Sequence, residues 1–180
     1  VVHFSEVRFL GGLEESHLHQ VRTYAERLGL QIEIGMRSIC PSSNLFDASQ
    51  GRAEEQLSRM IGSAQIAGSP IVRAVVGNRY DRRSGIPIEA HIENTVRVLR
   101  FVRSRALDTG IRIAIENHGG DMRASDLKML IEEAGTDFVG ACLDSGNLLM
   151  TLDVPLAALE CLAPYVLTSH VRDSEVWRTP

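Results

Sequence analysis

The segment that decides the fold is IRIAIENHGG, residues 111–120. Its first half is apolar and indicates a strand, which ends abruptly on Glu116, Asn117 and His118 before two glycines. Strands of a parallel sheet are covered by helices on both faces and are therefore apolar along most of their length. Polar residues at their carboxyl ends are informative, because that edge carries the active site in α/β proteins.

Two later segments end in the same way. Asp144 follows the apolar run of GACLDSGN, residues 140–147, and His170 lies near the end of VLTSHVRD, residues 166–173. If the strands are neighbours, these two side chains and that of Glu116 converge on one point. A single acid at a strand end more often caps a helix or pairs with a loop cation, but three such residues on successive strands favour a shared site.

Two carboxylates and an imidazole are costly to bring together unless another group compensates their charge. A divalent cation does so, and carboxylate oxygens with one imidazole suit Mn2+, Mg2+, Co2+ or Zn2+. Such a cation polarises a substrate carbonyl or hydroxyl, and a neighbouring carboxylate can move a proton. We therefore expect Glu116, Asp144 and His170 to form a metal site.

Three further polar residues are candidate substrate contacts at the rim of this site: His118, Asn147 and Arg172. Each has a structural alternative. His118 can bond to neighbouring backbone, Asn147 can serve as a turn residue, and Arg172 can pair with Asp173. The spacing alone leaves these alternatives open.

The whole chain alternates short apolar runs with longer amphipathic ones. Strands are predicted over residues 1–9, 30–39, 71–77, 111–117, 138–147 and 165–173, and helices over residues 13–29, 51–69, 88–110, 124–135 and 154–164. This alternation predicts parallel βαβ units with right-handed connections. Either a doubly wound open sheet or most of a (β/α)8 barrel, which usually takes about 250 residues, would satisfy it. No GxGxxG follows the first strand and no GxxxxGK[ST] occurs, which argues against a nucleotide-binding open sheet.

Other titratable residues are expected to be structural. Glu33 could face the mouth of a barrel, but a salt bridge to Arg37 or Arg73 is the favoured interpretation. His91 lies on a helical pattern and is interpreted as a surface or helix-face residue. The run DRR at residues 81–83 is expected to be a solvated loop.

The composition is that of a soluble globular protein, with 180 residues, 44% hydrophobic and 23% charged. A net charge of −4 and 5% aromatic residues argue against nucleic acid and anionic membranes as partners. The three cysteines are widely spaced and form no CxxC motif, so we expect reduced thiols and a cytoplasmic location. No run reaches the roughly 18 apolar residues of a membrane helix, and no signal peptide is recognisable.

The segments IAIENHGG, GACLDSGN and LAPYVLTSHVRD resemble, in order and spacing, the fifth, sixth and seventh strands of the xylose isomerase-like TIM-barrel superfamily. The similarity is to its sugar phosphate isomerase/epimerase branch. It covers nearly the whole chain and is most specific from Arg112 to Asp173. The resemblance implies a single (β/α)8 domain over residues 1–180, with about strands two to seven present and native residues missing at both ends. The Val1 start and the VWRTP end agree with that expectation.

The resemblance also implies one divalent metal ion, held by Glu, Asp, His and a second Glu. The first three carry over to Glu116, Asp144 and His170, and the fourth belongs to an eighth strand that this chain does not reach. In the family, the two glutamates also form an acid/base pair that moves a proton alpha to a carbonyl through an enediolate. Glu116 would be one member of that pair, its partner being absent from this sequence, and the substrate would be a small sugar or sugar phosphate.

Departures from the family pattern bear on the substrate. Asn147 stands where ketose epimerases often have a histidine, which argues against a ketohexose epimerase. The extra histidines of the related abasic-site nucleases are missing. A metal-dependent dehydratase or lyase acting on a ring polyol or keto acid is the alternative enzyme, and a non-catalytic sugar-binding barrel is the alternative of another class. A barrel without its first and eighth strands would have two unpaired sheet edges, which a second copy of the chain in a homo-oligomer could cover.

Overall fold

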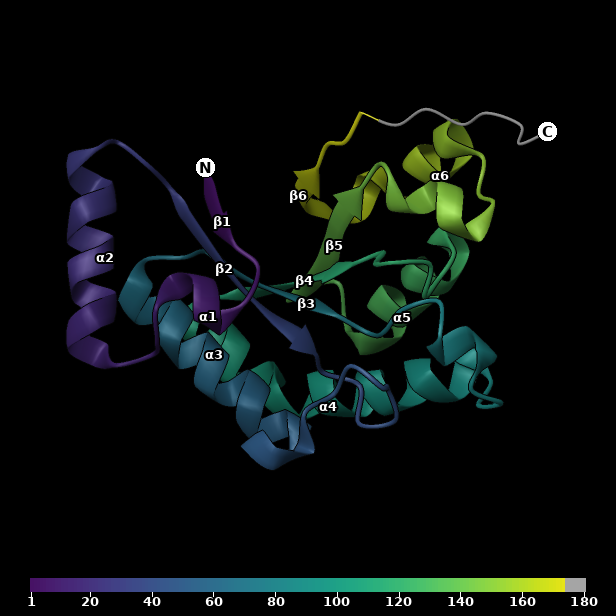
Figure 1. The fold of residues 1–180 in the computed structure, drawn as a ribbon, viewed down its shortest axis with the longest axis horizontal. Helices are drawn as coiled ribbons and strands as arrows, with labels where there is room; N and C mark the ends of the chain where they lie inside the picture. Colours follow the sequence, from purple (N-terminus) through teal and green to yellow (C-terminus); the bar gives the residue numbers. More distant parts are fainter. Residues whose placement is uncertain (174–180) are drawn as a thin grey trace.

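Six strands form one parallel sheet in the computed structural model, which describes residues 1–173 (Figure 1). They lie in sequence order, each beside the next along the chain. Their bounds are β1 (Val2–Phe4), β2 (Ile32–Ser38), β3 (Ile71–Val75), β4 (Arg112–Glu116), β5 (Val139–Asp144) and β6 (Val166–His170). The predicted α/β class and strand order are confirmed.

The five predicted helices are present on the outer side of the sheet (Figure 1). They are α2 (Glu15–Arg27), α3 (Ala53–Ala67), α4 (Ile88–Thr109), α5 (Ala124–Ala134) and α6 (Pro155–Leu162). Each of the longer ones buries an apolar stripe, as Ile92, Val96 and Leu99 do on α4. None of the helices within residues 1–173 has the length and apolar character needed to cross a bilayer.

A short helix replaces part of the first predicted strand. Residues 1–9 were expected to be extended, but β1 ends at Phe4 and α1 (Val7–Leu10) follows. Gly11, in the left-handed region with φ of 92°, closes this turn by donating its N–H to the carbonyl of Val7. The strand prediction failed here because one helical turn leaves no periodicity long enough to detect.

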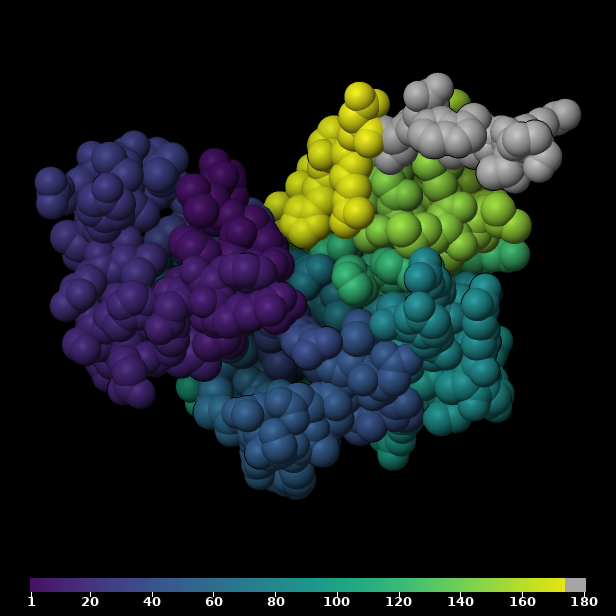
Figure 2. Space-filling model, in the orientation of Figure 1, coloured from purple at the N-terminus to yellow at the C-terminus, as the bar shows by residue number. Residues whose placement is uncertain are grey.

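The sheet is strongly curved, and this curvature decides between the two predicted architectures, the open sheet and the barrel. In a flat sheet, β2 and β6 would lie about 19 Å apart, since four spacings of about 4.8 Å separate them. Instead the Thr168 hydroxyl donates to Glu33 Oε2 at 2.9 Å, and the rings of His3 and His170 lie 4.8 Å apart. The six strands therefore form part of a barrel wall. Figure 2 shows the open notch between the N-terminal segment and β6.

Side chains alternate between the two faces of this wall. Those that point outward, such as Ile34, Val72 and Ile113, join the main apolar core beneath the helices. Those that point inward form a small apolar cluster of Ile71, Ala114 and Cys142, and charged side chains lie further along the same face. The interior of the barrel is therefore the polar part of the fold.

Several local expectations are wrong. Glu33 bonds to His3 and Thr168 instead of an arginine. His91 is fully buried and lies 2.8 Å from the Ser42 hydroxyl, because α4 begins against the loop after β2. Asp81 is also buried, since its carboxylate accepts hydrogen bonds from neighbouring loop residues.

Candidate active site

The carboxyl ends of β4, β5 and β6 bring Glu116, Asp144 and His170 together. The register aligns Asp144 with His170 and places Glu116 opposite Cys142 on the adjacent strand. His170 Nδ1 lies 3.2 Å from Glu116 Oε2 and 3.8 Å from Asp144 Oδ2. Both carboxyl groups are buried, whereas the imidazole is partly exposed. The three side chains face one point inside the barrel.

Glu116 is held by neighbours on both of its oxygens. Arg73, on β3, donates from Nε to Oε2 at 2.5 Å, and Asn147 donates from Nδ2 to Oε1 at 3.2 Å. Burial by itself would raise the pKa of Glu116, but the hydrogen bond from His170 and the charge of Arg73 outweigh it and lower the pKa to about 2. The side chain is therefore a carboxylate in the physiological pH range.

Asp144 divides its two oxygens between different partners. Oδ1 accepts the backbone N–H groups of Gly146 and Asn147, both at 2.9 Å, so the turn after β5 fixes the carboxylate. Oδ2 faces His170 and forms an ion pair with Arg172 Nη2 at 2.6 Å, but the pair lacks the alignment of a hydrogen bond. Oδ2 is thus a buried oxygen without a directed donor, which is what a cation site requires.

The three candidate rim residues behave differently. Asn147 joins the cluster by a hydrogen bond to Glu116. Arg172 joins it by an ion pair with Asp144 and does not pair with Asp173. His118 does not join the cluster, because its Nδ1 bonds to the Gly77 carbonyl at 2.9 Å. Of the two interpretations of His118, a hydrogen bond to neighbouring backbone is therefore the one that the structure shows.

The sequence did not reveal the contacts that three further residues make at the site. Arg73 is a charged residue inside the apolar run IVRAVVG, and that interruption was the available signal. Asn117 exchanges two hydrogen bonds with the backbone of Asp144, both at 2.9 Å, and so joins the ends of β4 and β5. Asp121 is buried and accepts three backbone N–H groups, from Gly77, His118 and Met122, but no sequence pattern marked it.

The donor atoms fit a divalent cation. Ligands about 2.1 Å from a tetrahedral ion lie about 3.4 Å from one another, close to the separations of Nδ1 from the two carboxylates. The ligand atoms of Glu116, Cys142 and His170 also lie within 4.8 Å of one another. The Cys142 thiol is buried with its pKa raised, mainly by that burial, so the oxygen and nitrogen donors are the better ligands.

The comparison with protein families finds one match over most of the chain. The family model described as xylose isomerase-like TIM barrel matches residues 3–178. A curated protein, 3-oxo-isoapionate decarboxylase of Pectobacterium atrosepticum, is 22% identical over 161 residues, which cover 89% of this chain and 51% of that protein. The chain thus spans about half the length of this curated relative.

Solved structures agree on the fold. The 3-keto-D-glucoside 4-epimerase YcjR of E. coli superposes with a TM-score of 0.71 at 14% identity, covering 88% of this chain and 65% of that one. The IolI protein, solved with a bound zinc atom, gives a TM-score of 0.67 at 17% identity, covering 89% and 58%. At these identities the likeness shows the fold alone.

Proposed function

Since the chain belongs to the xylose isomerase-like TIM barrel family, we propose that it carries most of the metal and acid/base site of a sugar or sugar phosphate isomerase or epimerase. Glu116, Asp144 and His170 are its metal ligands, and Glu116 is its catalytic base. The observation that carries the proposal is the convergence of these three side chains, with Glu116 Oε2 and the undirected Asp144 Oδ2 both facing His170 Nδ1.

The residues present suit proton transfer alpha to a carbonyl. A bound divalent cation would polarise the substrate carbonyl and so acidify the neighbouring C–H. Glu116 accepts the proton on a carboxylate oxygen, while Arg73 and Asn147 fix the orientation of that carboxylate. The lowered pKa keeps Glu116 ionised, as a group that accepts a proton has to be.

The small polar interior also supports a sugar-like substrate. Arg172 is half-exposed at the rim and is available to contact a polar or anionic group of the substrate. The three free cysteines fit a reducing compartment, so we place the protein in the cytoplasm.

A lyase is the second candidate, and the curated relative favours it. That protein is named a decarboxylase, and loss of CO2 from a 3-oxo acid also leaves a carbanion beside a carbonyl. The same cation and carboxylates would serve both reactions, which differ in the group that leaves the carbon, a proton in one and CO2 in the other. Release of CO2 from a 3-oxo acid, without exchange of hydrogen into a ketose, would identify the lyase.

Solvent exchange tests the proposal in the intact protein. Incubation with a panel of ketoses and ketose phosphates in D2O should give deuterium at the carbon next to the carbonyl, detected by NMR. Glu116→Gln should lower that exchange by at least about 100-fold, because the proton acceptor is removed. His170→Ala should lower the bound metal measured by mass spectrometry, whereas the exposed His19→Ala should change neither quantity.

Two results would contradict the proposal. Metal content that is equal in the parent protein, His170→Ala and Glu116→Gln would remove the metal site. Tight binding of a sugar with no hydrogen exchange, dehydration or CO2 release would instead indicate a non-catalytic sugar-binding barrel.

A further inference from the structure

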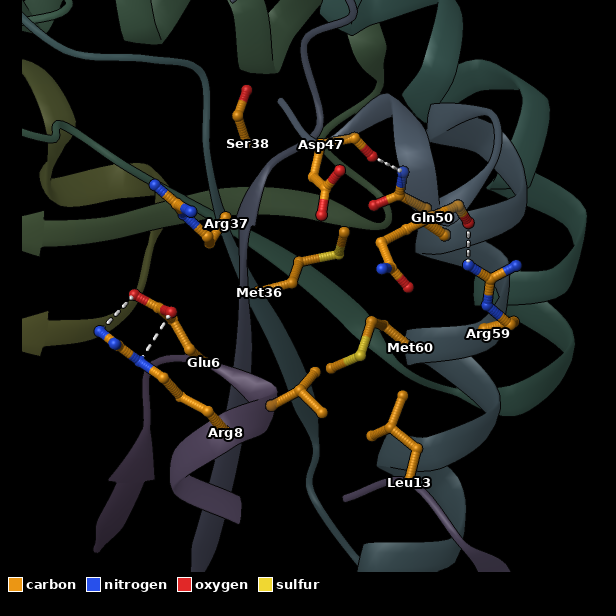
Figure 3. Close-up of a pocket in the computed structure, with 12 residues that line it drawn as sticks. Glu6, Arg8, Leu13, Met36, Arg37, Ser38, Asp47, Gln50, Arg59 and Met60 are labelled. Carbon is orange, nitrogen blue, oxygen red and sulfur yellow. Dashed lines mark hydrogen bonds and ion pairs between the residues drawn. The ribbon is translucent and has the colours of Figure 1, made fainter. Parts of the chain in front are cut away.

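A hollow lies on the outer face of β2, and its lining contains none of the candidate active-site residues. Its volume is about 260 Å³, and it is bounded by the segment after β1, the end of β2, the following loop and the first turns of α3 (Figure 3). The side chain of Met36 packs in the apolar core outside the sheet, whereas Arg73 and Glu116 contact each other on the inner face, so β2 lies between the hollow and the active site. The residues that line the hollow have no role in the proposed reaction.

The floor of this hollow is apolar. Val7, Leu13, Met36 and Met60 form it, and the two methionines are nearly buried beneath it. Unbranched thioether side chains adapt to ligands of different shape, and sulfur makes favourable contacts with aromatic rings. The floor therefore suits a flat apolar or aromatic body.

Most polar groups around the hollow already have partners within the protein. Glu6 pairs with Arg8 at 3.1 Å, and Arg59 donates to the Gln50 carbonyl at 2.6 Å (Figure 3). Asp47 accepts both the N–H and the hydroxyl of Ser49 on Oδ1, which engages one of its two oxygens. Arg8 and Arg59, the two other arginines of the rim, are therefore already engaged within the protein.

Arg37 is the exception. It lies at the end of β2 beside the floor, and no hydrogen bond or ion pair to it is found among residues 1–173. The lining carries three arginines against two acids, so its net charge is positive. A planar guanidinium binds a carboxylate through two parallel hydrogen bonds.

From the apolar floor and the free guanidinium, we propose that this hollow is a binding site for a small amphipathic monoanion, namely an aromatic or aliphatic carboxylate. The apolar body lies on Met36 and Met60, and the carboxylate pairs with Arg37. The site is distinct from the candidate active site and does not rest on the proposed function.

Methionine NMR tests this site directly. The chain contains five methionines, and Met36 and Met60 alone line the hollow. In the intact protein labelled with methyl-13C methionine, benzoate should shift the signals of Met36 and Met60, assigned by substitution with leucine. Met122, Met129 and Met150 should stay in place. A ligand of this size should bind with a Kd on the order of 1 mM.

Charge selection is the second half of the test. Benzyl alcohol, which has a similar shape but no charge, should bind about 10-fold more weakly than benzoate, and Arg37→Met should weaken benzoate by about the same factor. Arg27→Met is the matched control, an exposed arginine outside the hollow, and should leave benzoate binding unchanged. Unchanged signals of the three other methionines verify that both variants fold.

Three results would overturn the proposal. The first is no shift of Met36 and Met60 with benzoate up to about 10 mM, well above the expected Kd. The second is an equal response to benzyl alcohol, which would leave only an apolar crevice. The third is benzoate binding that Arg37→Met leaves intact.

Discussion

Replacement of Asp121 by asparagine should destabilise the fold although it changes one atom. Asp121 is buried and accepts the N–H of Gly77 on Oδ2 at 3.1 Å, and those of His118 at 2.9 Å and Met122 at 2.6 Å on Oδ1. These bonds tie the loop after β4 to the end of β3. An asparagine keeps one acceptor oxygen and turns its NH2 group toward the Gly77 N–H, which then has no acceptor.

The magnitude follows from the lost bond. A hydrogen bond to a charged or strongly polar group contributes about 1.5–3 kcal/mol, and an unsatisfied buried donor costs about 1–3 kcal/mol. These terms overlap, so Asp121→Asn should lower the free energy of unfolding by about 2–4 kcal/mol, measured by urea denaturation. The exposed Asp108→Asn on α4 is the control and should stay within about 0.5 kcal/mol of the parent protein.

The stability that Asp121 contributes should also change with pH, in a direction set by its pKa. Burial raises the pKa of Asp121 well above its usual value, although the three N–H donors oppose that rise. A raised folded-state pKa means that the stability from this group is fully present below the unfolded pKa and is lost as pH rises through the folded one. The difference in free energy of unfolding between the parent protein and Asp121→Asn should therefore become smaller as the pH increases. A gap that widens instead would show that the N–H donors outweigh burial, and a gap near zero at every pH would refute the hydrogen-bond argument.

Three further substitutions test the fold around the site. Asn117→Ala should cost about 1–3 kcal/mol in urea denaturation, because it removes both side-chain bonds to the Asp144 backbone. Gly140→Ala should destabilise by about 1–3 kcal/mol, since an added Cβ would lie 2.5 Å from the Tyr165 carbonyl; a thermal midpoint equal to that of the parent protein would contradict this. Leu127→Ala in α5 should cost about 2–5 kcal/mol, and the more exposed Met129→Ala less than half as much.

The site residues that could be predicted are those placed by local pattern. Glu116, Asp144 and His170 each follow an apolar run, and the carboxyl ends of neighbouring parallel strands always share one edge. To predict their convergence, it was enough to expect that consecutive strands are neighbours in the sheet. The alternation of strands and helices already favoured that order. Their roles as metal ligands stay a prediction.

Residues whose partners depend on curvature could not be predicted. Glu33 and Thr168 are separated by 135 positions and meet only because the sheet curves, so no local spacing pairs them. Arg73 was one of the two arginines, with Arg37, that were expected to pair with Glu33, but it contacts Glu116 on the next strand. Each is a charged or polar residue in a strand, and the sequence shows the anomaly without showing which partner compensates it.

The two oxygens of Asp144 have different surroundings, which separates this carboxylate from that of an ordinary buried ion pair. On Glu116 and on Asp144, one oxygen is fixed by neutral donors, through Asn147 and the turn after β5. The other oxygen of each faces His170 and an arginine. A pair selected only for stability gains by satisfying both oxygens, because buried charge is costly to desolvate. On Asp144, Oδ1 is held in place while Oδ2 faces His170 and the half-exposed Arg172, whereas Glu116 is held on both oxygens, with the buried Arg73 on Oε2. Asp144 Oδ2 is therefore the carboxylate oxygen of this cluster that is best placed to meet a cation or a substrate.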